Sequence, residues 1–446
     1  AAAPSAGWSS FDSYGGRPDG ELASLWQQAD SSSQTLGLIS NLAQQSLFVL
    51  HGTADDNVPL SEAELMLAAL AEAGAPEPSV HFEEGAGHWW GNRCVDWPGI
   101  FELFRERAAE FTAEDWRPQP HELHFRTVDP AIDSKHYWVE VLQARNPGEP
   151  VEVHGWWDES TRILKVDAGS AAALRLEAPN RGRPIEWRVD GATFAGKATM
   201  KYLWVVRGER GEWVVGRPKA GHKTPELPGN FKRAFESRFV LVYGTAGDDE
   251  LDRELYERAR FDLQNWSYRA GGEPQLWSDE EYLQRAGDLT RFDSSAASPD
   301  EADPAMDLWF GRNVILYGSR DSNAAWTPVL GDTSDEGVPL DVSDGGLRFG
   351  ETELEGEDLV ALFLRPHASG GGNQVGVVGV TGAQAARLSL QVPYFVSGVG
   401  LPDWTVFDAG ILGTPGDPES GGDTAVLAAG WFANDWSFAR PSHLRD

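Results

Sequence analysis

The sequence predicts an α/β protein of three units: a parallel sheet with flanking helices, then a β sandwich, then a second open α/β sheet. Apolar runs alternate with amphipathic stretches over residues 1–117, and this rhythm returns over residues 233–446. Between them, residues 118–232 contain short β-type runs separated by Pro, Gly and Asp turns. A chain of 446 residues is long enough to bury three such cores.

The first unit is expected to alternate strands and helices. The run SLFVL within residues 46–52 is nearly all apolar, which is typical of a parallel strand buried on both faces. Ser61 followed by Glu64 has the spacing of a capping box, so we expect a helix to begin there. The expected strands are the end of residues 1–8, residues 46–52 and residues 79–85, and the expected helices are residues 22–28, 61–74 and 100–112.

The second and third units follow from the same reading of periodicity. Seven short runs with turn signals between them predict an antiparallel β sandwich: residues 121–128, 136–144, 151–157, 162–168, 174–178, 185–191 and 202–216. The third unit is expected to carry strands at residues 239–245, 313–319, 358–366 and 374–382 and a long helix at residues 250–269. Residues 293–304 and 414–423 are rich in Ser, Asp, Pro and Gly and are expected to be exposed loops.

The composition is strongly acidic. The chain has 69 Asp and Glu against 37 Lys and Arg, a formal net charge of −32. This charge repels nucleic acid and anionic membrane surfaces, and no run of about 18 apolar residues suits a membrane span. We therefore expect no nucleic acid and no membrane as partners. The acidity favours an extracellular or periplasmic setting, although residues 1–8 do not form a signal peptide.

An acid pair and a histidine follow two neighbouring predicted strands. Asp55 and Asp56 lie in HGTADDNVP after the first strand, and His88 lies in GAGHWW after the next. Because the carboxyl ends of parallel strands meet at one edge of an open sheet, we expect these side chains to converge. An acid and a histidine in this order, with one crossover helix between them, are typical of the last two members of a Ser…Asp…His triad.

With these motifs, residues 1–117 resemble the C-terminal half of an α/β-hydrolase domain of the prolyl oligopeptidase-like family of serine hydrolases and peptidases. The resemblance lies in HGTADDNVP and in the G-x-x-H turn. It implies a partial α/β-hydrolase fold followed by accessory domains, with Asp55 as the triad acid and His88 as the base. Asp56 is then expected to stabilise the turn through its own backbone.

The nucleophile that this resemblance implies is not found. No G-x-S-x-G occurs, and the nearest imitation, around Ser5, has no strand before it. We expect Ser5 to close a strand end, and the serines at 9, 10 and 13 have weaker claims. The nucleophile and the oxyanion donors would then belong to a missing N-terminal hydrolase half, because the sequence is a fragment or another chain supplies it. The chain alone should be inactive or nearly so.

Two tryptophans and a third histidine lie near the predicted site. Trp89 and Trp90 are candidate substrate-binding residues, since each offers a large apolar face, with packing as the equal alternative. No metal or cofactor is expected. His51 beside Asp55 and His88 lacks the spacing of a ligand set.

Three features outside the first unit are also interpreted as structural. His121 and His124, three residues apart on a strand, point to opposite faces and do not suggest zinc. The Gly-containing turns after residues 239–243 and 313–317 are neither G-x-G-x-x-G nor P-loops, so they are expected to be ordinary βα turns rather than phosphate cradles. The basic spot around Lys223 is interpreted as a linker anchor between the sandwich and the third unit.

The leading functional hypothesis is a portion of a serine hydrolase, a peptidase or an esterase, that acts on peptide or ester bonds through an acyl-enzyme. An acyl-transferase with the same triad is not distinguished from it by these residues. The alternative is a carbohydrate- or surface-binding accessory protein without catalysis. It rests on 19 Trp residues and on an expectation that Trp156 and Trp157 are exposed on the sandwich.

Overall fold

The computed structural model divides into two compact units, one of residues 1–18 and 30–218 and one of residues 19–29 and 219–446. The three-unit division at residues 117 and 232 stays a prediction, and residues 293–304 and 414–423 lie outside the described part. Among the described helices, none is long and apolar enough to cross a membrane. The described residues are 1–15, 20–43, 45–109, 120–179, 183–197, 199–290, 312–334, 338–370, 372–392, 394–396, 399–413, 425–439 and 442–445.

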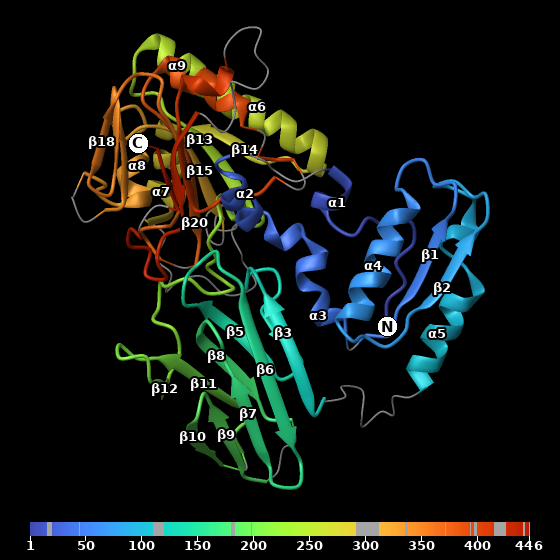
Figure 1. The fold of residues 1–446 in the computed structure, drawn as a ribbon. Coiled ribbons are helices and arrows are strands. Elements are labelled where there is room, and N and C mark those ends of the chain that lie inside the picture. Colours follow the sequence, from blue (N-terminus) through green and yellow to red (C-terminus); the bar gives the residue numbers. More distant parts are fainter. Residues whose placement is uncertain are drawn as a thin grey trace. The chain divides into compact units, whose positions relative to one another are not determined.

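The first unit begins with a small parallel sheet (Figure 1). Strands β1 (Phe48–Gly52) and β2 (Ser79–Glu83) pair in parallel, and residues 2–5 run parallel to β1 along its other edge. Helix α4 (Leu60–Glu72) connects the two strands, and α5 (Pro98–Ala109) follows β2. Every residue of β1 is buried, as its apolar sequence predicts. This mixed α/β arrangement is consistent with a partial α/β-hydrolase-like domain.

Helix α4 starts earlier than the sequence predicts. The expected capping box at Ser61 and Glu64 is wrong, because the helix begins at Leu60 and its N-cap is Pro59, with no side-chain hydrogen bond at the cap. Pro59 has an extended ψ of 143°, as is usual for the residue directly before the first helical residue. The side chain in the first turn of α4, Glu62, is buried and accepts hydrogen bonds from outside the helix.

The second part of the first unit is a sandwich of two five-stranded sheets, ordered β10-β9-β7-β6-β3 and β12-β11-β8-β5-β4. Inward and outward side chains alternate along β6, as expected for a strand with one face on the core. The expectation of a purely antiparallel sandwich is wrong at one place: β7 and β9 are parallel, because the intervening β8 crosses to the other sheet. The strands are β3 (Glu122–Thr127), β4 (Lys135–His136), β5 (Val139–Ala144), β6 (Val151–Asp158), β7 (Ile163–Asp167), β8 (Ala171–Glu177), β9 (Ile185–Val189), β10 (Ala192–Gly196), β11 (Tyr202–Arg207) and β12 (Trp213–Val215).

Tryptophan fills much of the sandwich core. Trp138 and Trp187 are fully buried, and a β-carbon at Gly155 would lie 2.2 Å from the ring of Trp138. Trp157, expected to be exposed, is 4% exposed and belongs to the core. Trp156 is half-buried, and the ammonium of Lys165 lies 4.7 Å from its ring centroid. Trp157 is therefore part of the core, and Lys165 lies over the ring of Trp156.

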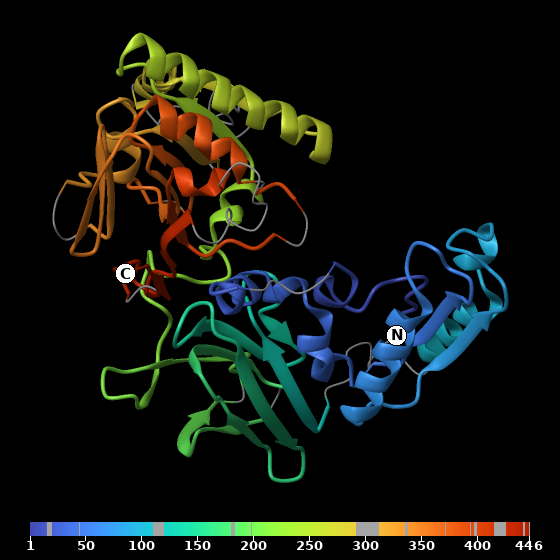
Figure 2. The ribbon, with the colours of Figure 1, turned by 45° about the horizontal axis from the view of Figure 1, so that its top comes forward.

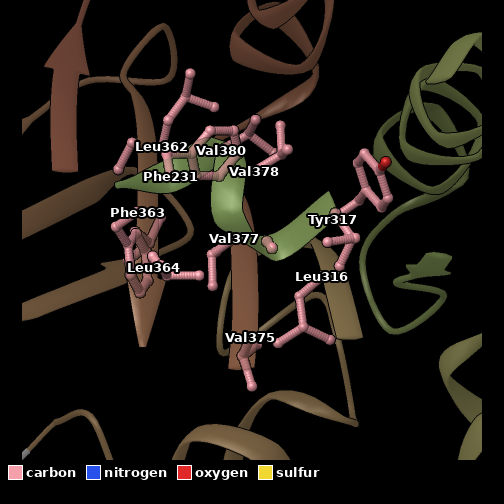
Figure 3. Packing of buried hydrophobic residues seen from close by; sticks show 14 of the residues in the cluster. Phe231, Leu316, Tyr317, Leu362, Phe363, Leu364, Val375, Val377, Val378 and Val380 are labelled. Atoms are coloured by element: carbon pink, nitrogen blue, oxygen red, sulfur yellow. The ribbon is translucent and has the colours of Figure 1, made fainter. Parts of the chain in front are cut away.

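The second unit is built on an eight-stranded sheet of order β14-β13-β15-β20-β19-β21-β22-β23. Its first four strands are parallel and its last four antiparallel. Figure 2 shows the long helix α6 beside α9, and Figure 3 shows the apolar packing of the sheet strands with Phe231. The strands are β13 (Phe239–Tyr243), β14 (Gln275–Ser278), β15 (Asn313–Gly318), β19 (Val360–Pro366), β20 (Gln374–Val380), β21 (Trp404–Phe407), β22 (Val426–Gly430) and β23 (His443–Leu444), with a separate antiparallel sheet of β16 (Leu340–Ser343), β17 (Gly346–Phe349) and β18 (Thr352–Glu355).

Helices and short 3₁₀ turns complete the two units. The first unit also contains α1 (Phe11–Gly15) and α3 (Ile39–Leu42). The second contains α2 (Ala23–Ala29), α6 (Asp249–Ala270), α7 (Asp279–Thr290), α8 (Trp326–Leu330) and α9 (Ala383–Leu388). Short 3₁₀ turns lie at Ser31–Ser33, Thr35–Leu38, Asn92–Cys94, Phe231–Phe235, Ser389–Gln391 and Ala409–Leu412.

Helix α2 packs within the second unit, whereas the sequence placed residues 22–28 in the first. Leu22, Leu25 and Ala29 form a buried cluster with residues of β22 and the turn after it: Val426, Ala429 and Trp431. A short amphipathic helix shows which of its own faces is apolar. Its sequence does not show which sheet that face covers.

Lys223, the predicted linker anchor, is buried inside the second unit. Its ammonium donates to the carboxylate of Asp403 and, at 2.7 Å, to the carbonyl of Phe432. Asp403 is itself fully buried and also accepts hydrogen bonds from the backbone amides of Asn230 (2.6 Å) and Phe432 (2.7 Å). One carboxylate thus joins three segments of the unit that are far apart in sequence.

Candidate active site

The loops that follow β1 and β2 are tied to each other through their backbones. The amide of Ala54 donates to the carbonyl of Ala86 at 2.9 Å, and the amide of Gly85 donates to the hydroxyl of Thr53 at 2.8 Å. At the end of β1, a β-carbon on Gly52 would lie only 2.4 Å from the carbonyl oxygen of Ala86. The two loops approach this closely because residue 52 has no side chain.

These loops place Asp55 in contact with His88. The Nδ1 atom of His88 lies 2.9 Å from Oδ2 and 3.1 Å from Oδ1 of Asp55. The carboxylate is fully buried, and the imidazole is 22% exposed. The contact engages Nδ1 and leaves Nε2 as the ring nitrogen that can exchange a proton with another group.

Asp55 also closes the turn that leads into α4. Its Oδ1 accepts hydrogen bonds from the amides of Asn57 (3.0 Å) and Val58 (2.8 Å). The expectation that Asp56 does this is wrong: Asp56 is exposed, and the first acid of the pair makes the turn. One carboxylate therefore orients the histidine and shapes the loop that presents it.

The surroundings of Asp55 favour its ionised form. Burial alone would raise the pKa of this carboxyl, but the amide of Val58, the ring of His88 and the amide of Asn57 outweigh burial and lower the pKa from its ordinary value of 3.8. Asp55 is therefore a carboxylate at neutral pH. A carboxylate facing Nδ1 favours the tautomer that carries hydrogen there and stabilises an imidazolium when Nε2 accepts a proton.

His51 lies under the same loop without completing a metal site. Its Nε2 is 2.9 Å from the carbonyl of Val58 and 3.5 Å from Oδ2 of Asp55. Because a carbonyl only accepts hydrogen bonds, this Nε2 carries hydrogen and is not free to bind a metal. His51 therefore packs the buried side of the carboxylate.

The serines considered as nucleophiles make other contacts. Ser5 pairs with β1, and its hydroxyl donates to the carbonyl of Cys94, in keeping with the expected strand-end role. Ser9 and Ser13 donate to Glu62, Ser9 through its amide (2.8 Å) and hydroxyl (2.6 Å) and Ser13 through its hydroxyl (2.7 Å). Within the described part of the chain, no serine hydroxyl is hydrogen-bonded to His88.

The two tryptophans after the histidine differ in their surroundings. Trp89 is 77% exposed, with its ring edge-on to His88 at a centroid distance of 5.8 Å. Trp90 is half-buried, and its ring centroid lies 6.0 Å from that of Trp97. The guanidinium carbon of Arg93 lies 5.6 Å from the ring centroid of Trp90. Trp89 and Trp90 both stay candidates for substrate contact, and the packing alternative has its contacts at Trp90.

The close approach at Gly52 gives a testable prediction. Gly52→Ala should force the loops after β1 and β2 apart and destabilise the first unit by about 1–3 kcal/mol, the usual range for overpacking. It should also weaken the Asp55–His88 hydrogen bond, measured by NMR of the Nδ1 proton of His88. Gly87→Ala is the matched control, because its β-carbon would meet only the carbonyl of Ala54, at 3.9 Å. Equal effects of both variants would contradict this account.

Sequence reasoning missed the role of Gly52. Its signal is present in the sequence as a glycine placed between a buried strand and the acidic turn. It also missed that His154 on β6 lies directly opposite His124 on β3, because this opposition is set by the register of the two strands.

Comparison with known proteins supports the resemblance at this site. Residues 11–97, which contain both Asp55 and His88, match the prolyl oligopeptidase family. The whole chain is 24% identical over 469 aligned residues to an uncharacterized secreted protein of Arthroderma benhamiae. The alignment covers 100% of this chain but 45% of that protein, so the chain spans less than half of its relative's length. No solved structure matches the chain.

Proposed function

We propose, from the similarity of residues 11–97 to the prolyl oligopeptidase family, that this chain supplies the acid and the base of a serine hydrolase acting on peptide or ester bonds. The observation that carries the proposal is the contact between the buried carboxylate of Asp55 and Nδ1 of His88 at 2.9 Å. A buried acid on Nδ1 with Nε2 left available is the arrangement that general-base catalysis by histidine requires.

In the proposed reaction His88 transfers the protons. Its Nε2 takes the proton of a serine hydroxyl as that oxygen attacks the carbonyl carbon, and then protonates the leaving amine or alcohol. Water next attacks the acyl-enzyme, and the same imidazole again accepts and returns the proton. Asp55 stays ionised throughout and stabilises the imidazolium.

We place the nucleophile and the oxyanion donors outside residues 1–446, in an N-terminal hydrolase half on the same or another polypeptide. Two observations support this partner. The hydroxyls of Ser5, Ser9 and Ser13 are engaged by Cys94 and Glu62. A mainly apolar hollow of about 420 Å³ lies beside residues 2–9, β1 and α4, where further elements of such a domain could pack.

An extracellular location is part of the proposal. The relative from Arthroderma benhamiae is described as secreted, and the net charge of −32 suits a protein exposed to salt outside the cell.

An activated ester and a fluorophosphonate probe test the proposal. The 446-residue chain alone should neither turn over the ester nor take up the probe, whereas the polypeptide extended through its natural upstream sequence should do both. His88→Ala should abolish turnover by the extended protein. Turnover by the short chain that is lost on Ser5→Ala would refute the assignment of the nucleophile, and turnover that survives His88→Ala would refute the function itself.

A further inference from the structure

The outer face of the sandwich brings together two histidines and a carboxylate. The register of β3 and β6 sets His124 directly opposite His154. Glu152 lies two residues before His154 and so projects from the same face of β6. One possible ligand atom from each of the three side chains lies within 4.8 Å of the other two. Among the described residues, no other group of three His, Cys, Asp or Glu side chains is this close together.

We propose that His124, His154 and Glu152 form a site for a divalent transition metal of the zinc class, with water completing the coordination. Two imidazole nitrogens and one carboxylate oxygen are a ligand set that Zn²⁺ takes up in proteins, usually with one open position. Zinc–ligand distances of about 2.0–2.2 Å require neighbouring ligand atoms to approach to about 3.4 Å. Side-chain rotation on two adjacent strands can supply this movement without a change in strand pairing.

The present geometry leaves a ring nitrogen without a partner. The two imidazoles are stacked at a centroid distance of 4.0 Å, with His124 Nε2 4.0 Å from the nearer oxygen of Glu152. That Nε2 is buried and has no hydrogen-bond partner. A buried polar atom without a partner is unfavourable, and a bound metal would satisfy it.

Arg126 is the competitor for this site. It stands opposite Glu152 in the register, and its guanidinium forms an ion pair with that carboxylate. A bound metal would have to break the ion pair between Arg126 and Glu152 and would also be repelled by the positive charge of Arg126. The strand β3 is at the edge of its sheet, so a metal held from both strands would fasten that edge to β6.

Calorimetric titration of the tag-free chain with Zn²⁺ tests the proposal. We expect one Zn²⁺ per chain and no binding of Ca²⁺, which prefers oxygen ligands. His124→Asn and His154→Asn should each weaken Zn²⁺ binding by more than about tenfold, since even outer-shell changes cost 10–100-fold. His81→Gln is the matched control, because His81 pairs with Glu83 two residues along β2 at 2.8 Å and lies outside the three-ligand group.

A gain of affinity separates the proposal from misfolding. Arg126→Gln should tighten Zn²⁺ binding, because it frees Glu152 and removes a nearby positive charge. Circular dichroism would check that each variant keeps the β-sheet signal of the wild type. A wild-type chain that binds no Zn²⁺, or a site unchanged in the His124→Asn/His154→Asn double variant, would overturn the proposal.

Discussion

Replacing Asp55 with asparagine is expected to lower kcat of the catalytically complete protein by about 10⁴-fold, the size of effect seen when a triad acid loses its charge. The substituted side chain would keep an oxygen for the amides of Asn57 and Val58, so the turn should survive. Its amide nitrogen, however, would favour the His88 tautomer that carries hydrogen on Nε2. That nitrogen could then no longer accept a proton from a hydroxyl.

Asp56→Asn provides the control for this prediction. It makes the same chemical change one residue away, but Asp56 is exposed, and the imidazole is in contact with Asp55. We expect its kcat and KM to stay close to those of the wild type, because surface changes of this kind have small effects. Comparable losses in the two variants would show that the charge of the loop matters, rather than the contact with His88.

Replacing Asp403 with alanine is expected to lower the free energy of unfolding of the second unit by about 3–5 kcal/mol, because it leaves a buried charge without its partner. The ammonium of Lys223 would lose its carboxylate, and the amides of Asn230 and Phe432 would lose an acceptor. Hydrogen exchange of the backbone amides of the second unit, followed over a series of denaturant concentrations, would measure the change.

Two further variants separate the buried charge from general damage. Glu351→Ala removes an exposed carboxylate of the same unit and should cost less than about 1 kcal/mol. Adding Lys223→Met to Asp403→Ala should recover part of the loss, since the unpaired ammonium is then gone. A double variant less stable than Asp403→Ala alone would contradict the assignment of this cost to Lys223.

The sequence predicted the elements that depend on local patterns. The apolar run before Gly52 marked a buried parallel strand, and the two loops after β1 and β2 placed Asp55 and His88 at one edge because parallel strands end together. The catalytic roles of both residues stay predictions. Local rules were less reliable for detail: Pro59 rather than Ser61 caps α4, and Asp55 rather than Asp56 holds the turn.

Features that depend on pairing between distant segments could not be predicted. The spacing of His121 and His124 argued against a metal at this strand, and the opposition of His124 and His154 follows from a register that one strand alone does not reveal. The parallel pair β7 and β9 depends on which sheet receives β8. The burial of Trp157 likewise depends on which face of β6 meets the core.

The assignment of α2 to the second unit means that the two units are not contiguous stretches of the polypeptide. A truncated protein starting at Lys219 would lack α2, the helix that covers Val426, Ala429 and Trp431. These apolar side chains would then be exposed to water. A separately expressed second unit therefore has to include residues 19–29 as well as residues 219–446.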